Sequence, residues 1–283
     1  MAIILGLTAA LFWGATDVLG RIGSRHVGVA RAMLYGQMPA VVLLTIYLAA
    51  APVRLPHDAP ALAWIAGIGS SQVLLAGTYA LFRGLSTGRL IVVSPVTASY
   101  GAVTALLADV SGETIGLLGW TGIAVTVAGV ALMAVPPRGA QHAGRTHSGL
   151  GWALAASLGY GFGFWLQGAL AVPSLGAVLP VWLYYVSGVP TLLLLFGRGS
   201  LTLPPAGTRA ILTGIGVLGV VAYVAFSAGL ATGAVAVVTV LSSLASGVAV
   251  LIARVALDEK VAPHQWGGLV VILGGLACLG AAR

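Results

Sequence analysis

The sequence predicts an all-α integral membrane protein, with ten transmembrane helices arranged as two inverted five-helix repeats around a central cavity. Three observations lead to this fold class. The chain of 283 residues is 59% hydrophobic and only 7% charged, whereas soluble domains average about 25% charged residues. Apolar runs of about 20 residues, the length that spans a bilayer core, recur along the whole chain. The third observation is an internal repeat.

The repeat is clearest in residues 225–259, which align with an earlier stretch at an offset of 145 residues, so that Gly84 falls on Gly229. After one inserted residue the offset becomes 146, and Glu113 falls on Glu259. A match of this length at a fixed offset indicates two copies of one structural unit.

Hydropathy marks ten apolar spans, and turn residues separate them. The first run is read as a retained helix, because no basic segment precedes it. The longest polar segment follows the fifth span and predicts a linker at 138–147, between a first repeat at 1–137 and a second at 148–283. The expected spans are 2–21, 30–50, 60–82, 89–109, 115–135, 149–170, 177–197, 208–230, 234–253 and 264–281.

The odd number of spans in each repeat predicts their relative orientation. Two copies of a five-span unit must cross the membrane in opposite senses, as in many secondary transporters. Basic residues gather in the loops after odd-numbered spans, which marks those loops as cytoplasmic and places both termini on the non-cytoplasmic side. Of the 13 Lys and Arg residues only Arg54 and Arg283 lie on the other side; the rest are Arg21, Arg25, Arg31, Arg83, Arg89, Arg138, Arg145, Arg198, Arg209, Arg254 and Lys260.

Charge and cysteine content exclude several classes of protein. The net charge of +7 comes from basic residues spread singly between apolar runs, so no nucleic-acid partner is expected. The single Cys278 lies in an apolar run, which excludes an intrachain disulfide and gives no sign of a cysteine-based metal site. Glycine pairs seven residues apart predict close helix packing in the fifth and tenth spans, at Gly122, Gly129, Gly268 and Gly275.

Hydroxyl side chains form a stripe on one face of the ninth span. From Thr239 to Ser246 they follow the spacing i, i+3, i+4, i+7. The matching positions in the fourth span are small or polar: Ser94, Thr97, Ala98 and Gly101. The stripe predicts either the wall of a partly wet cavity or close helix packing. We favour the cavity because the stripe recurs in both repeats. The predicted substrate contacts of this kind are Ser94, Thr97, Thr239, Ser242 and Ser243.

Aromatic side chains lie within the spans as well as at their ends. A Tyr or Trp in mid-membrane needs a partner for its O–H or N–H, which indicates a binding site. Interfacial anchoring is the alternative, and it suits the tryptophans near span ends better. Gln72 shares a helical face with Tyr79 and is a further candidate. These predicted contacts are Trp13, Gln72, Tyr79, Tyr100, Tyr160, Trp165 and Tyr223.

Asp17 is the only acidic residue well inside a span, since Asp109 lies at the end of the fourth. Such residues are costly in lipid and indicate a function, here proton coupling or binding of a substrate ammonium group. The alternative is an i,i+4 ion pair with Arg21 near the helix end. Pro95 removes a backbone hydrogen bond in the fourth span, where its repeat counterpart is Val240. It predicts a kink that serves gating or static packing.

Short motifs occur in the same order as in a known family. LFWG at 11–14 lies in the first span, ALFRGL at 80–85 closes the third, Pro95 lies early in the fourth, and Glu113 and Glu259 precede glycine-rich final helices. Together they resemble the paired EamA domains of the drug/metabolite transporter superfamily. Within it the chain is similar to ten-span bacterial exporters of amino acids, including aromatic amino acid exporters of the YddG type.

This resemblance implies a basket of two inverted bundles in the bacterial inner membrane, working by alternating access. The first, third, fourth, sixth, eighth and ninth helices would form the cavity. The sequence departs from the family pattern in two ways. Many ten-span relatives keep both termini in the cytoplasm, whereas the basic residues here predict the reverse. The second repeat also lacks a proline that matches Pro95.

We therefore expect a secondary exporter of small amphipathic metabolites, above all aromatic and neutral amino acids. A lipid or cationic-xenobiotic transporter is the alternative, because fold does not fix substrate and Arg83 and Arg89 would suit a head group. The expected partners are a small-molecule substrate and the lipid bilayer, and the chain is expected to act as a monomer. No cofactor, metal or catalytic residue is expected, since neither a Walker A loop nor an enzyme motif is present.

Overall fold

The computed structural model describes residues 1–50, 56–111, 116–135, 143–232, 238 and 241–281. All regular secondary structure in this part of the chain is helical, which confirms the predicted all-α class. Among the described residues, six helical stretches are long and apolar enough to cross a membrane: Ala2–Val27, Val29–Ala50, Ala61–Thr87, Leu90–Leu107, Val178–Phe196 and Ala206–Leu230.

Helical structure lies in each range that hydropathy marked, although in the ninth range it is described mainly from Leu241 onward. One boundary differs from expectation, because α7 begins inside the segment expected as a linker. In order, the elements are α1 (Ala2–Val27), α2 (Val29–Ala50), α3 (Ala61–Thr87), α4 (Leu90–Ala98), α5 (Tyr100–Val110), α6 (Leu117–Ala134), α7 (Ala143–Leu166), η1 (Gln167–Ala171), α8 (Val172–Leu175), α9 (Val178–Phe196), η2 (Arg198–Leu201), α10 (Ala206–Leu230), α12 (Ala245–Ala256) and α13 (Pro263–Ala281).

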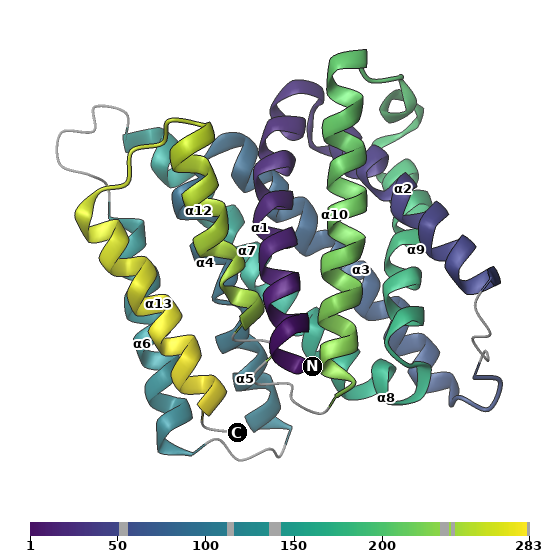
Figure 1. Cartoon of the computed structure of the whole chain (residues 1–283), viewed down its shortest axis with the longest axis horizontal. Coiled ribbons are helices and arrows are strands. Elements are labelled where there is room, and N and C mark those ends of the chain that lie inside the picture. The colour runs from purple at the N-terminus through teal and green to yellow at the C-terminus, as the bar shows by residue number, and fades with distance from the viewer. Residues whose placement is uncertain (51–55, 112–115, 136–142, 233–237, 239–240, 282–283) are drawn as a thin grey trace.

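The helices form one bundle, with α6 and α13 at one edge and α2 and α9 toward the other (Figure 1). Helix α1 packs between α10 and α12, while α7 packs on α3, α4 and α5. Helix α1 begins and α13 ends at the same end of the bundle (Figure 1). The centre of the bundle is therefore surrounded by helices from both halves of the sequence.

The fourth and ninth apolar ranges are both interrupted at the same repeat position. Between α4 and α5, the backbone N–H of Ser99 donates to Val96 O at 3.2 Å, a tighter turn than an α-helix makes. At an offset of 145 residues, the N–H of Leu244 donates to Leu241 O at 3.2 Å. Pro95 precedes only the first of these turns, so a proline is not required for the break.

Helix α7 ends in a π-helical turn, η1, rather than continuing straight. A π-turn accommodates one extra residue per turn and is often found at functional sites. Its first residue, Gln167, is completely buried and accepts a hydrogen bond from the Tyr223 hydroxyl at 2.9 Å. The turn thereby places an amide behind a tyrosine of α10.

Glycines bring α6 and α13 into close backbone contact, as their spacing predicted. A Cβ added to Gly275 would lie 2.4 Å from Thr126 Oγ1 and 2.7 Å from Gly122 O. A Cβ added to Gly129 would lie 2.9 Å from Gly268 O. Larger residues at these positions would force the two helices apart, so the glycines serve the scaffold.

Candidate functional site

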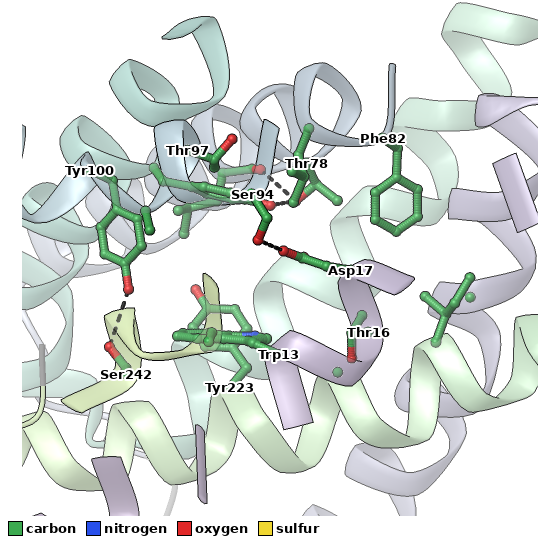
Figure 2. Close-up of a pocket in the computed structure, with 18 of the residues that line it drawn as sticks. Trp13, Thr16, Asp17, Thr78, Phe82, Ser94, Thr97, Tyr100, Tyr223 and Ser242 are labelled. Atoms are coloured by element: carbon green, nitrogen blue, oxygen red, sulfur yellow. Dashed lines mark hydrogen bonds between the residues drawn. The ribbon is translucent and has the colours of Figure 1, made fainter. Parts of the chain in front are cut away.

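A cavity of about 130 Å³ lies at the centre of the bundle, lined by α1, α2, α3, α4, α5, α7, α9, α10 and the Leu241–Ala256 stretch. Two of these, α2 and α9, were not among the helices expected from the resemblance. Figure 2 shows polar and aromatic side chains from several helices converging on this space. The predicted residues that line it are Trp13, Asp17, Ser94, Thr97, Tyr100, Tyr160, Tyr223, Ser242 and Ser243.

Asp17 points from α1 toward α4, where its carboxylate accepts a hydrogen bond from the Ser94 hydroxyl (Figure 2). Arg21, the expected i,i+4 partner, instead forms an ion pair with Glu259. Within the described lining of the cavity, Asp17 is the only charged side chain. The carboxylate is therefore available to a ligand or a proton rather than neutralised by a neighbouring base.

Aromatic rings form the wall on the α7 and α10 side of the cavity. The Trp13 ring centroid lies 5.9 Å from that of Phe164 and 6.3 Å from that of Tyr223. Tyr160 stacks on Phe164 at 5.7 Å, and Tyr100 meets Phe164 at 5.4 Å. These distances are typical of aromatic clusters, which offer a large rigid apolar surface to a ligand.

Hydroxyl groups from both halves of the chain meet within the cavity. The Tyr100 hydroxyl lies 3.2 Å from Ser242 Oγ, which joins the two interrupted spans. The Thr97 hydroxyl donates to Ala153 O at 3.4 Å. The hydroxyl stripes of the fourth and ninth spans thus face the same space.

The structure places other predicted contacts away from this lining. The Gln72 amide donates to Ser187 Oγ at 2.8 Å and accepts from Thr191 at 2.9 Å, so it joins α3 to α9. Tyr79 stacks on Phe196 at 5.3 Å, also between α3 and α9. Trp165 packs on its own helix, against Phe162 at 5.7 Å. Pro95 is buried within α4 and is not among the lining residues, and Thr239 lies outside the described residues.

Several lining residues were not predicted as substrate contacts. Thr78 on α3 accepts a hydrogen bond from the Tyr160 hydroxyl at 3.1 Å and lies 2.8 Å from the Tyr184 hydroxyl. Thr16 lies beside Asp17 in the sequence, and Gln37 is a polar residue within the second span that the sequence marks as a weaker candidate. The remaining polar or aromatic lining residues are Phe82, Phe164, Tyr185 and Ser246.

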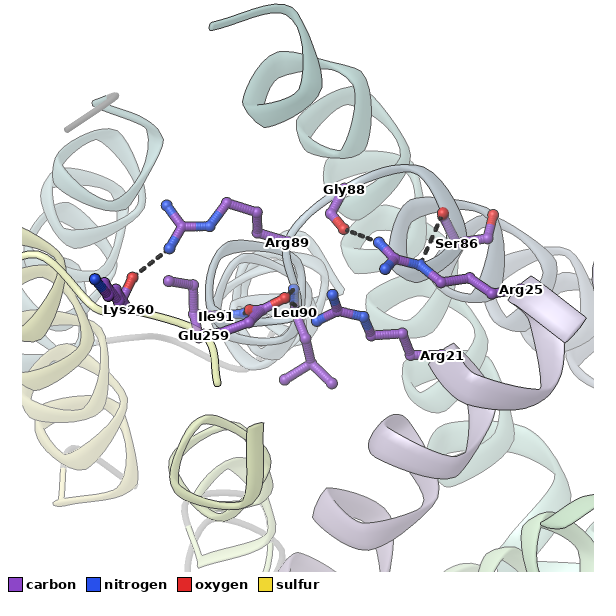
Figure 3. Close-up of polar contacts among 9 residues, drawn as sticks. All are labelled: Arg21, Arg25, Ser86, Gly88, Arg89, Leu90, Ile91, Glu259 and Lys260. Atoms are coloured by element: carbon purple, nitrogen blue, oxygen red, sulfur yellow. Dashed lines mark hydrogen bonds and ion pairs between the residues drawn. The ribbon is translucent and has the colours of Figure 1, made fainter. Parts of the chain in front are cut away.

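A polar cluster lies one helical turn beyond Asp17 along α1, where Arg21 follows it by four residues. Figure 3 shows the residues of this cluster. Arg21 forms an ion pair with Glu259, and both side chains are buried. The same carboxylate accepts from the backbone N–H of Leu90 at 3.4 Å and of Ile91 at 3.2 Å, at the N-terminus of α4. An anion at a helix N-terminus is stabilised by the free N–H groups and the helix dipole. Glu259 therefore connects α1, α4 and the segment that follows α12.

Two more arginines extend this cluster. Arg25 donates to Ser86 O at 3.2 Å and to Gly88 O at 2.9 Å, at the end of α3. Arg89 donates to the backbone carbonyl of Lys260, and partial burial lowers the pKa of its guanidinium from the usual value. The cluster thus combines one buried carboxylate with several guanidinium groups at a single end of the bundle.

The similarity to known proteins extends over nearly the whole chain and is not confined to the cavity. The model of a family described as the EamA-like transporter family matches residues 1–135 and 147–281. A solved structure titled "Crystal structure of protein" is similar with a TM-score of 0.67 and 17% identity, over 98% of this chain and 95% of that one. At this identity the likeness concerns the fold alone. No curated protein matches the sequence.

Proposed function

Because the chain belongs to the EamA-like transporter family, we propose that it exports small amphipathic metabolites across the bacterial inner membrane by alternating access. Membership in this family makes it a multi-pass membrane transporter of small molecules and not an enzyme. The observation that carries the proposal is the central cavity, in which Asp17, hydroxyl groups and aromatic rings from both halves of the chain face one space. Aromatic and neutral amino acids are the substrates to test first, because they combine an ammonium group with an apolar body.

The ten-helix inverted repeat is part of this proposal, and equivalent contacts in the two halves support it. A Cβ added to Gly14 of α1 would lie 2.7 Å from Val248 Cβ, and one added to Gly161 of α7 would lie 2.5 Å from Val103 Cβ. Val103 and Val248 are repeat counterparts, at an offset of 145 residues. The first helix of each half therefore packs on the fourth span of the other half through the same contact.

Other helix pairs show the same exchange. Helix α1 packs on α10, the third long helix of the second half, and α7 packs on α3, the third of the first half. The final helices α6 and α13 pack on each other, as do α2 and α9. A contact pattern that is unchanged when the halves are exchanged is expected of two units related by a two-fold axis. It supports repeats at 1–137 and 148–283 and a cavity completed within a monomer.

The membrane orientation that we propose follows the basic residues. Arg21, Arg25, Arg89 and Lys260 gather at one end of the bundle (Figure 3), which the excess of Lys and Arg marks as cytoplasmic. Helix α1 begins and α13 ends at a common end of the bundle (Figure 1). This arrangement agrees with an even number of spans and with both termini on the non-cytoplasmic side.

The Arg21–Glu259 pair is proposed as the gate that closes the cytoplasmic end. Arg21 follows Asp17 by four residues on α1, and Ile91 precedes Ser94 by three on α4. The pair therefore lies beyond the Asp17–Ser94 bond by about 6 Å along α1 and about 4.5 Å along α4. Opening this end requires α1, α4 and the segment after α12 to separate. Pro95 and the turn at Ser99 would allow α4 to bend during that motion.

Asp17 is proposed as the coupling residue. Its carboxylate lies inside the bundle and bonds to Ser94, and no base neutralises it within the described lining. A carboxylate in this position can exchange a proton for a cationic group as the cavity opens to each side. Coupling of substrate export to proton entry would then require that a proton and the substrate never bind to Asp17 at the same time.

The test is uptake of a radiolabelled amino acid panel into proteoliposomes, with and without an imposed pH gradient. The proposal predicts saturable transport of aromatic and neutral amino acids that the gradient stimulates in the parent but not in Asp17→Asn. Asp58→Asn removes the same charge from an exposed turn and should behave like the parent. Saturable transport that the gradient does not change would indicate a facilitator. If no amino acid shows saturable transport, the amino acid assignment is refuted.

One observation favours a second class of substrate, the organic cations. In the described lining of the cavity no Lys, Arg or His accompanies Asp17. A lipid with an anionic head group would need such a base, so the same observation weighs against the lipid alternative.

A further inference from the structure

Most hydroxyl protons around the cavity are donated to acceptors within the protein itself. The Ser94 hydroxyl donates to the Asp17 carboxylate, the Thr16 hydroxyl to Phe12 O at 2.8 Å and the Ser246 hydroxyl to Ser243 O at 3.0 Å. A serine or threonine hydroxyl has one proton and two lone pairs. Once the proton is committed, the oxygen can offer the cavity only its acceptor side.

The tyrosines around Thr78 are committed in the same way. The Thr78 hydroxyl donates its proton to Leu74 O at 2.9 Å. It must therefore accept from both the Tyr160 hydroxyl, at 3.1 Å, and the Tyr184 hydroxyl, at 2.8 Å. The Tyr223 hydroxyl likewise donates to Gln167 Oε1 at 2.9 Å. These phenol oxygens also keep only lone pairs for a ligand.

Acceptors therefore dominate the polar surface of the cavity, and Asp17 adds a carboxylate to them. The aromatic wall acts in the same sense, because the face of a Trp, Tyr or Phe ring attracts a cation. The remaining donors on the wall are neutral: the indole N–H of Trp13, the Tyr185 hydroxyl and the amide of Gln37, neither of whose polar atoms has a partner in the described part of the chain. A neutral amide, however, does not balance the charge of a carboxylate.

This balance distinguishes an amine from an amino acid. An ammonium group finds Asp17, phenol and hydroxyl lone pairs and aromatic faces. A carboxylate group in the same cavity would lose its water and meet oxygen lone pairs and a second carboxylate, with no base in the described lining. A zwitterionic amino acid would gain these contacts at its ammonium group but would bury its carboxylate without a donor of positive charge.

We propose that the ligand of this cavity is a monocationic organic amine with an aromatic or branched apolar body, selected over the corresponding zwitterionic amino acid. This rests on the proposed transport function and narrows its substrate class. The amine lies against Asp17 and Ser94 on the α1–α4 side, and the apolar body lies against Phe164 and Trp13. Phe164 is the counterpart of Asp17 at the repeat offset of 147 residues, so one end of the pseudo-symmetric site is acidic and the other aromatic.

The experiment compares ligands with one body and different charges. Equilibrium binding to the full purified chain in detergent is measured by calorimetry for 2-phenylethylamine, phenylalanine methyl ester, phenylalanine and 3-phenylpropionate. The two cations should bind at least about ten-fold more tightly than phenylalanine, and the anion should not bind. In Asp17→Asn the preference for cations should fall to within about three-fold, while Asp58→Asn should keep it.

The outcomes separate the inference from the function on which it rests. Phenylalanine binding as tightly as the amine, together with saturable phenylalanine transport, would overturn the inference and leave the proposed exporter intact. Binding of the anion would overturn it as well. If none of the four compounds binds to a folded parent protein, and none is transported, both the inference and the proposed function fail. Because the central comparison uses the parent alone, it does not depend on how well a variant folds.

Discussion

Replacing Glu259 with Gln tests the proposed gate most directly. Arg21 and Glu259 are each 8% exposed, and Glu259 also caps the N-terminus of α4 through Leu90 and Ile91. Removing one partner of a buried ion pair costs about 3–5 kcal/mol. If the pair forms only when the cytoplasmic end is closed, the substitution destabilises the closed state by this whole amount and leaves the open state unaffected. Since about 1.4 kcal/mol is a factor of ten, about 3 kcal/mol favours the open state by roughly a hundred-fold.

The assay is the accessibility of a cysteine placed in the cavity. Ala98 lines the cavity with a side chain that makes no hydrogen bond, so Ala98→Cys in a Cys278→Ala background provides a single reporter thiol. In inside-out vesicles, the rate of modification by a membrane-impermeant thiol reagent should rise at least ten-fold when Glu259→Gln is added. In right-side-out vesicles the rate should fall or stay constant, because the open state exposes only one side.

The matched control is Asp58→Asn, which removes a carboxylate from an exposed turn and should leave both rates unchanged. Circular dichroism and gel filtration verify that each variant keeps its helices and its size. An unchanged labelling rate in a folded Glu259→Gln protein would show that the ion pair does not hold this end closed. Equal acceleration from both sides would mean general loosening of the bundle, and would also contradict the gate.

Three further substitutions, and one control, test the scaffold and the site. Gly275→Leu should lower the free energy of unfolding by about 1–3 kcal/mol or more, read as a lower unfolding temperature in detergent, because even a Cβ there lies 2.4 Å from Thr126 Oγ1. Tyr100→Phe removes a hydroxyl that bonds across the cavity and should weaken substrate binding about five-fold, the effect of about 1 kcal/mol. Tyr79→Phe, outside the cavity lining, should bind like the parent. Gly28→Ala should cost about 1–3 kcal/mol of stability, because the φ of 86° at this helix end is strained for any residue with a Cβ.

Hydropathy and the internal repeat were sufficient to predict the all-helical membrane class and most helix positions. In lipid each span must satisfy its own backbone, so a single apolar run largely determines a single helix. The same reasoning could not predict the ion-pair partner of Arg21. The local rule that pairs residues i and i+4 suggested Asp17, whereas the structure joins Arg21 to Glu259, 238 residues away in sequence. Only the packing of α1 beside α4 and α12 decides between these partners.

Helix α3 shows why part of the site could not be predicted. Gln72 and Tyr79 were correctly placed on one face of a helix, but that face turns toward α9 rather than the cavity. Thr78, which lines the cavity, lies one residue and about 100° away around the helix. Because α3 is packed by helices on several sides, its residues are apolar nearly all round. The sequence therefore carried no periodic signal to show which face met the cavity.

The scaffold repeats closely, but the chemistry does not, and this difference bears on mechanism. At an offset of 147 residues the counterpart of Asp17 is Phe164 and the counterpart of Arg21 is Gly168. A perfectly symmetric pair of repeats would present equal barriers at both ends and would bind a substrate equally well in two opposite orientations. Here one half supplies both the acid of the cavity and the arginine of the ion pair, so the proposed cytoplasmic gate has no equivalent arginine in the other half. The two ends must therefore open with different energies. Protonation of Asp17, or binding of a cation to it, would change the charge one helical turn from Arg21. Such a change would affect the proposed Arg21–Glu259 gate and not the opposite end of the bundle.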